Sequence, residues 1–271
     1  MAKFTEEDIL MRRIGQRFNK GVVKYRLIDD DDKILVGLSG GKDSLALLEL
    51  LAKRSRILKP KFSVVAVHVS MSNIPYQADL EYLRSYAEGL GVKFIHYETS
   101  FDPSTDTRKS PCFLCSWNRR KALFTVAKEE GCNKIALGHH MSDVIETTVM
   151  GMLYGGQLQG MLPRIKSTNF ENMELIRPLY CVLESDILRW KEHNDLQFIA
   201  CACKFTQNLT GGDEDTFSAR RKVKQLIAEL KKENPNVENN IFQSIHNVQL
   251  DTLAEYKQDG VKHSFLDKFE D

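Results

Sequence analysis

Short apolar segments alternate with segments of helical spacing through most of this 271-residue chain. Their hydrophobic residues run continuously, which is typical of strands buried on both faces. Strands that alternate with helices favour βαβ crossovers, so we predict an α/β fold, a parallel sheet with helices on both faces. The predicted strands are 34–38, 62–69, 92–97, 134–138 and 174–177, and the helices between them are 44–55, 79–90, 118–130 and 143–154.

Composition excludes several classes of protein. The 38 Lys and Arg residues against 37 Asp and Glu give a net charge of +1, which excludes a polycation but not a local basic patch. No apolar run approaches the length of about 18 residues that a membrane span needs, and the first residues lack the apolar stretch of a signal peptide. We therefore expect a cytoplasmic protein, where disulfides are rare, and the six cysteines indicate metal binding, catalysis or burial.

The two ends of the chain differ from its middle. Residues 5–27 have helical spacing with Thr5 and Asp8 as a capping pair, and their basic face is either a solvated face or a phosphate-binding surface. The tail predicts helices at 185–194 and 217–233, a loop at 201–215 and one more helix within 236–256. The predicted units are an N-terminal basic helical segment (1–30), an α/β domain (31–200), and a cysteine-bearing loop with a C-terminal helical extension (201–271).

A glycine-rich loop follows the first predicted strand. It reads Ser39-Gly40-Gly41-Lys42-Asp43-Ser44 and leads into a helix. The glycines permit a sharp turn and close approach of a ligand, while the N–H groups of the helix start and the two serine hydroxyls form a donor set for phosphate. The common nucleotide loop is different, because it needs Gly-x4-Gly-Lys followed by Ser or Thr. The hexapeptide in its strand–loop–helix context predicts a nucleotide-binding site.

Two pairs of cysteines are spaced like metal ligands. Cys112 and Cys115 stand three residues apart ahead of a predicted helix, and Cys201 and Cys203 lie in a predicted loop. A lone CxxC pair is compatible with a redox pair, half a zinc site or half an iron–sulfur site. No thioredoxin-like pattern surrounds this one, which favours a metal site. Cys132 and Cys181 flank strands, and we expect them to be buried.

Several segments carry a family resemblance. The glycine-rich hexapeptide resembles the PP-loop of the N-type ATP pyrophosphatases, and further segments resemble the tRNA 2-thiocytidine synthetase (TtcA) family. The segments appear in the family's order and span most of the chain. They are Pro111-Cys112-Phe113-Leu114-Cys115-Ser116-Trp117-Asn118-Arg119-Arg120, Ile135-Ala136-Leu137-Gly138-His139-His140, Tyr154-Gly155-Gly156, Gly160-Met161-Leu162-Pro163 and Ile176-Arg177-Pro178-Leu179.

The resemblance implies a five-stranded parallel sheet, ATP with Mg2+, and a [4Fe–4S] cluster on Cys112, Cys115 and Cys201. It further implies that the fourth iron site is open to hold sulfide. The implied reaction is adenylation by ATP of the C2 oxygen of a cytidine at position 32 of a tRNA, followed by replacement of that oxygen by sulfur to give 2-thiocytidine. The implied ATP site comprises Ser39, Gly40, Gly41, Lys42, Asp43, Ser44, His68, Gly138 and His139, and the implied catalytic residues are Asp43, Arg119 and Asp143.

The sequence departs from the family pattern at two places. Cys201-Ala202-Cys203 replaces a CxxC, so Cys203 is an alternative ligand, and four thiolates would suit zinc as well as a cluster. Ser142 stands where the family has the first of two aspartates, while Asp143, a residue for Mg2+ or substrate orientation, is retained. Arg119 is either a phosphate ligand or a helix-surface arginine, and His139 either a ligand contact or a structural residue.

The implied partners are tRNA, a sulfur donor such as a cysteine desulfurase, and a second copy of the chain in a homodimer. Basic stretches at 12–26 and 220–232 are candidates for tRNA phosphates. Two other functions stay open. The same site would serve a sulfur transferase for another nucleoside or a small molecule. The departures at 142 and 203 also suit a non-catalytic zinc- or nucleotide-binding protein.

Overall fold

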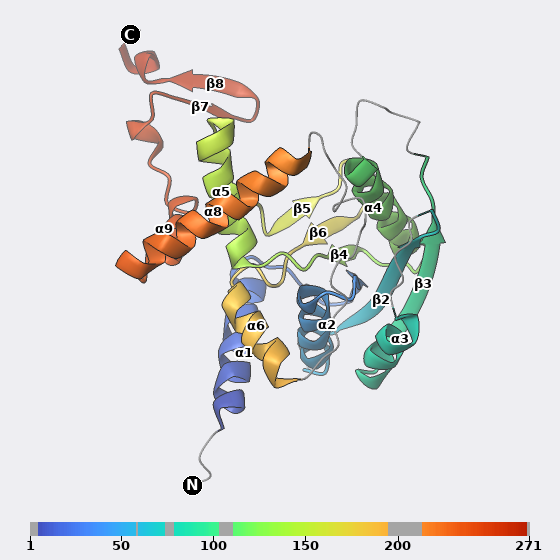
Figure 1. Ribbon diagram of the computed structural model, residues 1–271. Helices are drawn as coiled ribbons and strands as arrows, with labels where there is room; N and C mark the ends of the chain where they lie inside the picture. Colours follow the sequence, from blue (N-terminus) through green and yellow to red (C-terminus); the bar gives the residue numbers. More distant parts are fainter. Residues whose placement is uncertain (1–4, 58, 74–78, 103–110, 195–212, 270–271) are drawn as a thin grey trace.

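The computed structural model describes the chain except residues 1–4, 58, 74–78, 103–110, 195–212 and 270–271 (Figure 1). Its main sheet has the strand order β3-β2-β1-β4-β6-β5, and the first five strands in that order are parallel. The predicted parallel sheet is confirmed. The strands are β1 (Asp32–Gly37), β2 (Phe62–Met71), β3 (Lys93–Thr99), β4 (Lys134–Ala136), β5 (Arg164–Lys166) and β6 (Glu174–Ile176).

The edge strand β5 was not predicted. It pairs antiparallel with β6, with Ile165 opposite Leu175. Its sequence, Arg164-Ile165-Lys166, has a single apolar residue and carries no strand signal of its own. It forms because β6, which follows after a short connection, has an open edge to pair with. The pairing, and not the local sequence pattern, therefore determines this strand.

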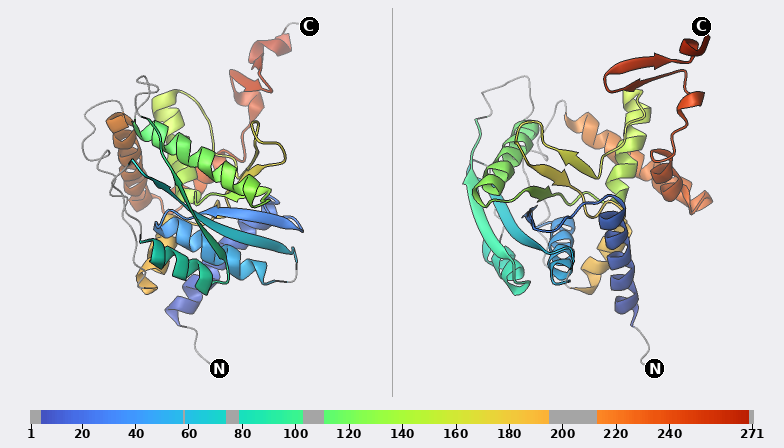
Figure 2. Two further views of the ribbon diagram at one scale, coloured as in Figure 1. Left: turned by 90° about the vertical axis from the view of Figure 1, so that its right-hand side faces the viewer. Right: turned by 180° about the vertical axis from the view of Figure 1, so that it is seen from behind.

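Helices cover both faces of the sheet, as predicted. Ile34 and Val36 of β1 point into the cluster formed by α1, α2, α3 and α6, while Leu35 between them points to α4 on the opposite face. Figure 2 shows the two layers from the side and from behind. The helices are α1 (Glu6–Lys24), α2 (Lys42–Ser55), α3 (Leu80–Gly89), α4 (Pro111–Glu129), α5 (Met141–Gly155), α6 (Glu184–His193), α8 (Asp213–Glu233) and α9 (Val237–Ser244).

Helix α1 begins at the predicted capping pair. The Asp8 N–H donates to the Thr5 hydroxyl at 3.1 Å, and the Thr5 N–H donates to the Asp8 carboxylate at 3.0 Å. Part of its basic face has an internal partner: Arg13 and Arg17 reach Asp186 of α6 at 2.6 and 3.1 Å. The basic face is therefore neither wholly solvated nor wholly available to a ligand.

The prediction of one further helix within 236–256 is wrong over its second half. Helix α9 ends at Ser244, a short 3-10 turn spans Leu250–Thr252, and a hairpin of β7 (Glu255–Gln258) and β8 (Val261–Ser264) follows. The hairpin turn is Asp259-Gly260, both at positive φ (50° and 82°), which suits this dipeptide and ends any helix. The hairpin projects away from the main sheet (Figures 1 and 2).

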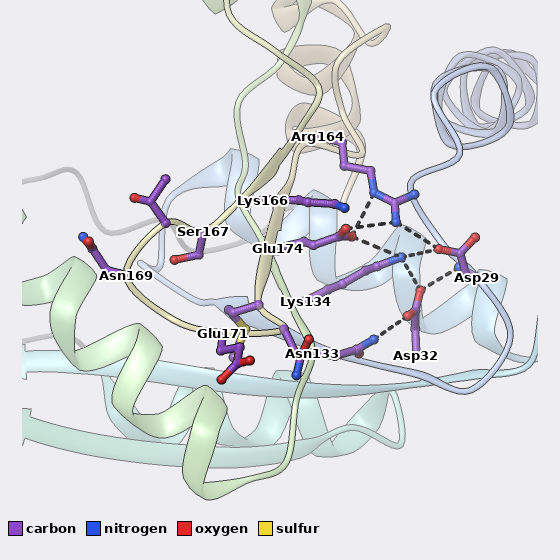
Figure 3. A pocket seen from close by; sticks show the side chains of 13 residues that line it. Asp29, Asp32, Asn133, Lys134, Arg164, Lys166, Ser167, Asn169, Glu171 and Glu174 are labelled. Carbon is purple, nitrogen blue, oxygen red and sulfur yellow. Dashed lines mark hydrogen bonds and ion pairs between the residues drawn. The ribbon is translucent and has the colours of Figure 1, made fainter.

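A pocket of about 620 Å3 lies at the amino-terminal edge of the sheet, away from the glycine-rich loop (Figure 3). The buried Lys134 ammonium sits at its base, 2.6 Å from Asp32 Oδ2, 2.8 Å from Asp29 Oδ2 and 3.7 Å from Glu174 Oε2. Arg164 braces the same carboxylates, 2.8 Å from Glu174 and 3.2 Å from Asp29. This ion network ties the starts of β1, β4 and β6 together.

The predicted division into three units stays a prediction, since its boundary at residue 201 falls outside the described residues. In the described part of the chain, none of the helices combines the length and the apolar character that crossing a bilayer requires.

Candidate nucleotide-binding site

The glycine-rich loop joins the carboxyl end of β1 to the start of α2. Gly40 has a φ of 81°, a left-handed conformation that favours glycine, and Gly41 is the N-cap of α2. Ser44 Oγ donates to the Gly41 carbonyl at 2.9 Å and accepts from the Ser39 N–H at 3.2 Å. These bonds hold the loop closed around the helix N-terminus, where backbone N–H groups attract phosphate.

The Lys42 side chain is held by two carboxylates. Its ammonium lies 3.0 Å from each Asp43 oxygen and 3.2 Å from Glu184 Oε1 at the start of α6. Burial alone would lower the pKa of Lys42, but the two carboxylates outweigh it and the pKa lies above its ordinary value. Lys42 is therefore a fixed positive charge beside the loop.

The connection from β4 to α5 lies against the loop. Gly138 packs so closely on Asp43 that a Cβ added there would meet the Asp43 Cβ at 3.4 Å. His140 is the N-cap of α5, and its ring nitrogens face Asp43 (3.6 Å from Nε2) and Asp143 (3.4 Å from Nδ1). The structure thus brings together three of the predicted site residues, because Asp43 and Asp143 face one imidazole and Gly138 packs on Asp43.

Helix α8 adds cations that the sequence interpretation did not place here. Arg220 Nη1 lies 3.7 Å from Asp143 Oδ1, and its Nε lies 3.8 Å from Glu146 Oε2. One turn later, Lys224 Nζ lies 2.5 Å from Glu184 Oε2. The sequence predicts this basic stretch as a contact for tRNA phosphates. In the structure, Arg220 and Lys224 face the carboxylates beside the glycine-rich loop.

Burial disfavours the charged form of two predicted histidines. His68 lies inside β2, which continues to Met71, and its Nδ1 is 2.7 Å from the Leu38 carbonyl. Burial lowers its pKa, with smaller contributions from His96 and Arg119. Burial and the charge of Arg177 likewise lower the pKa of His139. Arg119, half-buried on α4, is therefore near enough to His68 to act on its charge state.

The predicted metal ligands are only partly described. Helix α4 begins at Pro111, so positions 112 and 115 lie within its first two turns and not ahead of a helix as we predicted. Cys115 is half-buried, while Cys201 and Cys203 lie outside the described residues. Within the described ranges, no group of three or more potential metal ligands comes together. Cys132 and Cys181 are buried as expected, and burial raises the pKa of Cys132 to about 11.

Ser142, the departure from the family pattern, has a structural contact. Its hydroxyl accepts the Glu184 N–H at 3.2 Å and so fixes the first residue of α6. Glu184 joins Lys42 from a position far along the chain, and no local motif marked it. The loop, the β4–α5 junction and the start of α6 lie at the carboxyl ends of β1, β4 and β6, the edge where open α/β sheets bind ligands.

Comparisons with known proteins agree with this geometry. A model of the PP-loop domain family matches residues 7–208. The tRNA-cytidine(32) 2-sulfurtransferase of Geotalea daltonii is 35% identical over 246 residues, covering 90% of this chain and 94% of that protein. The protein of the same name from Paracidovorax citrulli is 33% identical over 265 residues, covering 96% of this chain and 80% of that protein.

Among solved structures, the U34-tRNA thiolase NcsA from Methanococcus maripaludis, with its [4Fe-4S] cluster, matches with a TM-score of 0.70 at 22% identity. The match covers 93% of this chain and 82% of that one, and it shows a shared fold. Fold and loop together define a PP-loop protein built to bind ATP. With the similarity to its relatives, they place the chain in the tRNA-cytidine(32) 2-sulfurtransferase family of PP-loop enzymes, which confirms the resemblance.

Proposed function

We propose that this enzyme is an ATP-dependent tRNA sulfurtransferase that converts cytidine 32 of tRNA to 2-thiocytidine. The observation that carries the proposal is the closed Ser39–Ser44 loop with its fixed Lys42, in a chain similar to tRNA-cytidine(32) 2-sulfurtransferases over nine-tenths of its length. The loop's N–H groups, its serine hydroxyls and Lys42 bind the phosphates of ATP.

Asp43 and Asp143 are the proposed carboxylates for Mg2+. They lie on either side of the His140 imidazole at the phosphate end of the site, and carboxylate oxygens are the ligands that Mg2+ prefers. Bound there, the ion would neutralise charge on the phosphates. His140 separates the two carboxylates and keeps them oriented when no ion balances their charge.

The cysteines are the proposed ligands of a [4Fe–4S] cluster. Positions 112 and 115 are three residues apart within the first two turns of α4, a spacing that puts two helix positions on one face. Thiolates are the usual ligands of such clusters. Cys201 is the third proposed ligand, with Cys203 as its alternative. The cluster would supply the sulfur atom, which a donor such as a cysteine desulfurase replenishes.

The reaction has two parts. The C2 oxygen of cytidine attacks the α-phosphorus of ATP, and pyrophosphate leaves. Sulfur then replaces that oxygen at C2, and the oxygen departs with AMP. In this scheme the loop and Lys42 hold the leaving pyrophosphate, Asp43 and Asp143 orient the triphosphate, and Arg119 supplies positive charge from α4.

A basic groove between α1 and α9 is the proposed contact for the tRNA backbone. It has a volume of about 260 Å3, and its lining includes Lys20, Lys24 and the amide side chains Asn236, Asn239 and Gln243. Lysine ammonium groups and amides bind phosphate and sugar without reading sequence. Because Asp186 holds Arg13 and Arg17, the exposed Lys20 and Lys24 are the cations of α1 that serve this contact best.

Mass spectrometry of nucleosides tests the proposal. Total tRNA from the parent strain and from a strain lacking this chain would be digested and compared, with complementation by the wild-type chain. We expect 2-thiocytidine to disappear on deletion and return on complementation. An unchanged 2-thiocytidine level contradicts the proposal, and loss of a different thiolated nucleoside identifies another acceptor. Cys201→Ala and Cys203→Ala complementation then identifies the third ligand.

A further inference from the structure

One carboxylate links the phosphate loop to helix α8. Glu184 presents Oε1 to the Lys42 ammonium at 3.2 Å and Oε2 to the Lys224 ammonium at 2.5 Å. Its own N–H is fixed by the Ser142 hydroxyl at 3.2 Å. The Glu184 side chain is only 18% exposed, and that of Lys42 only 20%, so solvent screens their contact weakly.

We propose that Glu184 is a positioning residue that aims Lys42 at the phosphates of ATP, and that Lys224 in turn holds Glu184 in place. The proposal rests on the proposed function, since it concerns ATP at the same loop. In this proposal α6 and α8 take part in the reaction, because they orient the lysine of the glycine-rich loop.

The need for such a residue follows from the chemistry of lysine. The ammonium stands on a flexible stem of four carbons, and ordering that stem costs rotamer entropy. Asp43 is the next residue along the helix and moves with Lys42, so it cannot fix the ammonium relative to the rest of the site. Glu184 comes from another helix, α6, and can therefore fix the ammonium relative to the site. The ammonium has three donors. With one N–H shared between the two Asp43 oxygens and one given to Glu184, the third is left for phosphate.

Lys224 is placed to hold Glu184 because α8 is itself anchored. Val223 and Ile227 of α8 are buried against Val144 and Ile145 of α5, and Figure 1 shows α8 crossing that helix. Burial would raise the pKa of Glu184, but its bonds to Lys224 and Lys42 outweigh it and lower the pKa. Glu184 therefore stays ionised, with each oxygen assigned to one lysine.

The test separates ATP binding from turnover. Glu184→Gln, Glu184→Asp and Lys224→Gln would be compared with the wild type, with Lys128→Gln as control. Lys128 is an exposed lysine near the end of α4, outside the phosphate loop and the basic stretch 220–232. Equilibrium titration gives the Kd for ATP without tRNA, and tRNA-dependent release of pyrophosphate gives kcat and KM.

We expect Glu184→Gln to lower kcat at least tenfold, with the Kd for ATP changed less than about threefold, since a misdirected lysine binds the ground state but not the transition state. Glu184→Asp recovers part of the loss. Lys224→Gln lowers kcat less, and the double variant Glu184→Gln/Lys224→Gln is no worse than Glu184→Gln. Lys128→Gln matches the wild type.

A wild-type kcat in Glu184→Gln overturns the proposal. It is also overturned if the fold-losses of kcat in the two single variants multiply in the double variant, since the two residues would then act independently. If thermal denaturation shows that Glu184→Gln does not fold, the comparison of Lys224→Gln with Lys128→Gln decides, and equal kcat values overturn the proposal. A wild-type chain that binds ATP but releases no pyrophosphate with tRNA shows a failure of the proposed function. If a different RNA triggers the release of pyrophosphate, the kcat values of the same variants on that RNA support or overturn the proposal by the same criteria.

Discussion

His140 and Asp143 form a reciprocal cap at the start of α5. The Asp143 N–H donates to His140 Nδ1 at 3.3 Å, and the His140 N–H donates to Asp143 Oδ2 at 3.0 Å. Because Nδ1 accepts, a ring proton stands on Nε2, which faces Asp43 Oδ1 at 3.6 Å. One side chain therefore caps the start of the helix and orients two carboxylates of the proposed Mg2+ site.

Substitution of His140 separates these two roles. We expect His140→Asn to keep the cap and His140→Ala to lose it, so the alanine variant has a free energy of unfolding about 1 kcal/mol lower than the asparagine variant. Both lose the contact to Asp43, and both have reduced turnover. Urea denaturation and pyrophosphate release measure the two effects. Equal stability of the two variants would show that the cap contributes nothing.

The left-handed backbone at Gly40 predicts a local effect on ATP binding. In Gly40→Ala the Cβ makes φ near 81° unfavourable by about 1–2 kcal/mol and alters the loop. We expect the Kd for ATP to rise at least about tenfold, the equivalent of 1.4 kcal/mol. Gly15→Ala on α1 is the control, since a Cβ there meets nothing within 4 Å and alanine favours helix. An unchanged Kd in Gly40→Ala would contradict the proposed phosphate contact.

The Lys134 network predicts a loss of stability without a direct effect on the site. Lys134→Met leaves Asp32, itself buried, without its 2.6 Å partner, and breaking a buried ion pair on one side costs about 3–5 kcal/mol. Chemical denaturation measures the change in the free energy of unfolding. Lys166→Met is the control, an exposed lysine lining the same pocket (Figure 3). A loss below 1 kcal/mol in Lys134→Met would mean that solvent enters the network.

The sequence predicted most of the sheet because apolar runs such as Ile34 to Leu38 and Phe62 to Val69 are strong local signals. It also predicted the loop, because the hexapeptide is contiguous. It missed β5 and the β7–β8 hairpin, whose short polar strands form through pairing. It missed Glu184 and the inward contacts of Arg220 for a different reason. Their partners lie far away in sequence, and a charged residue on an amphipathic helix looks the same whether it faces solvent or a carboxylate.

The buried Glu146 carboxyl predicts a dependence of stability on pH. Burial raises its pKa above 4.5, and the negative charges of Asp143 and Glu184 raise it further. The positive charges of Lys224 and Arg220 lower the pKa but are outweighed. A raised folded-state pKa means that the folded protein binds this proton more tightly than the unfolded chain, so ionisation costs stability as pH rises above 4.5. Glu146→Gln has no such cost.

We therefore expect Glu146→Gln to be more stable than the wild type at neutral pH, with the difference shrinking as pH falls toward 4.5. Urea denaturation across this range measures it. Glu129→Gln, an exposed position on α4, controls for general effects of charge. A wild type that is more stable than Glu146→Gln at neutral pH would show that the Arg220 ion pair outweighs the burial of Glu146.

The groove between α1 and α9 predicts how tRNA binding responds to salt. Lys20 and Lys24 line it, and each phosphate contact releases counterions, so removing both lysines lowers the slope of log Kd against log salt by about 2. We expect Lys20→Glu/Lys24→Glu to weaken tRNA binding at least tenfold at physiological salt and to leave the Kd for ATP unchanged. Lys128→Glu/Lys166→Glu makes the same charge change at exposed positions outside this groove, on α4 and β5, and should bind tRNA with the wild-type salt slope. If the two double variants weaken tRNA binding equally, the effect belongs to net charge, and the groove is not the site of contact.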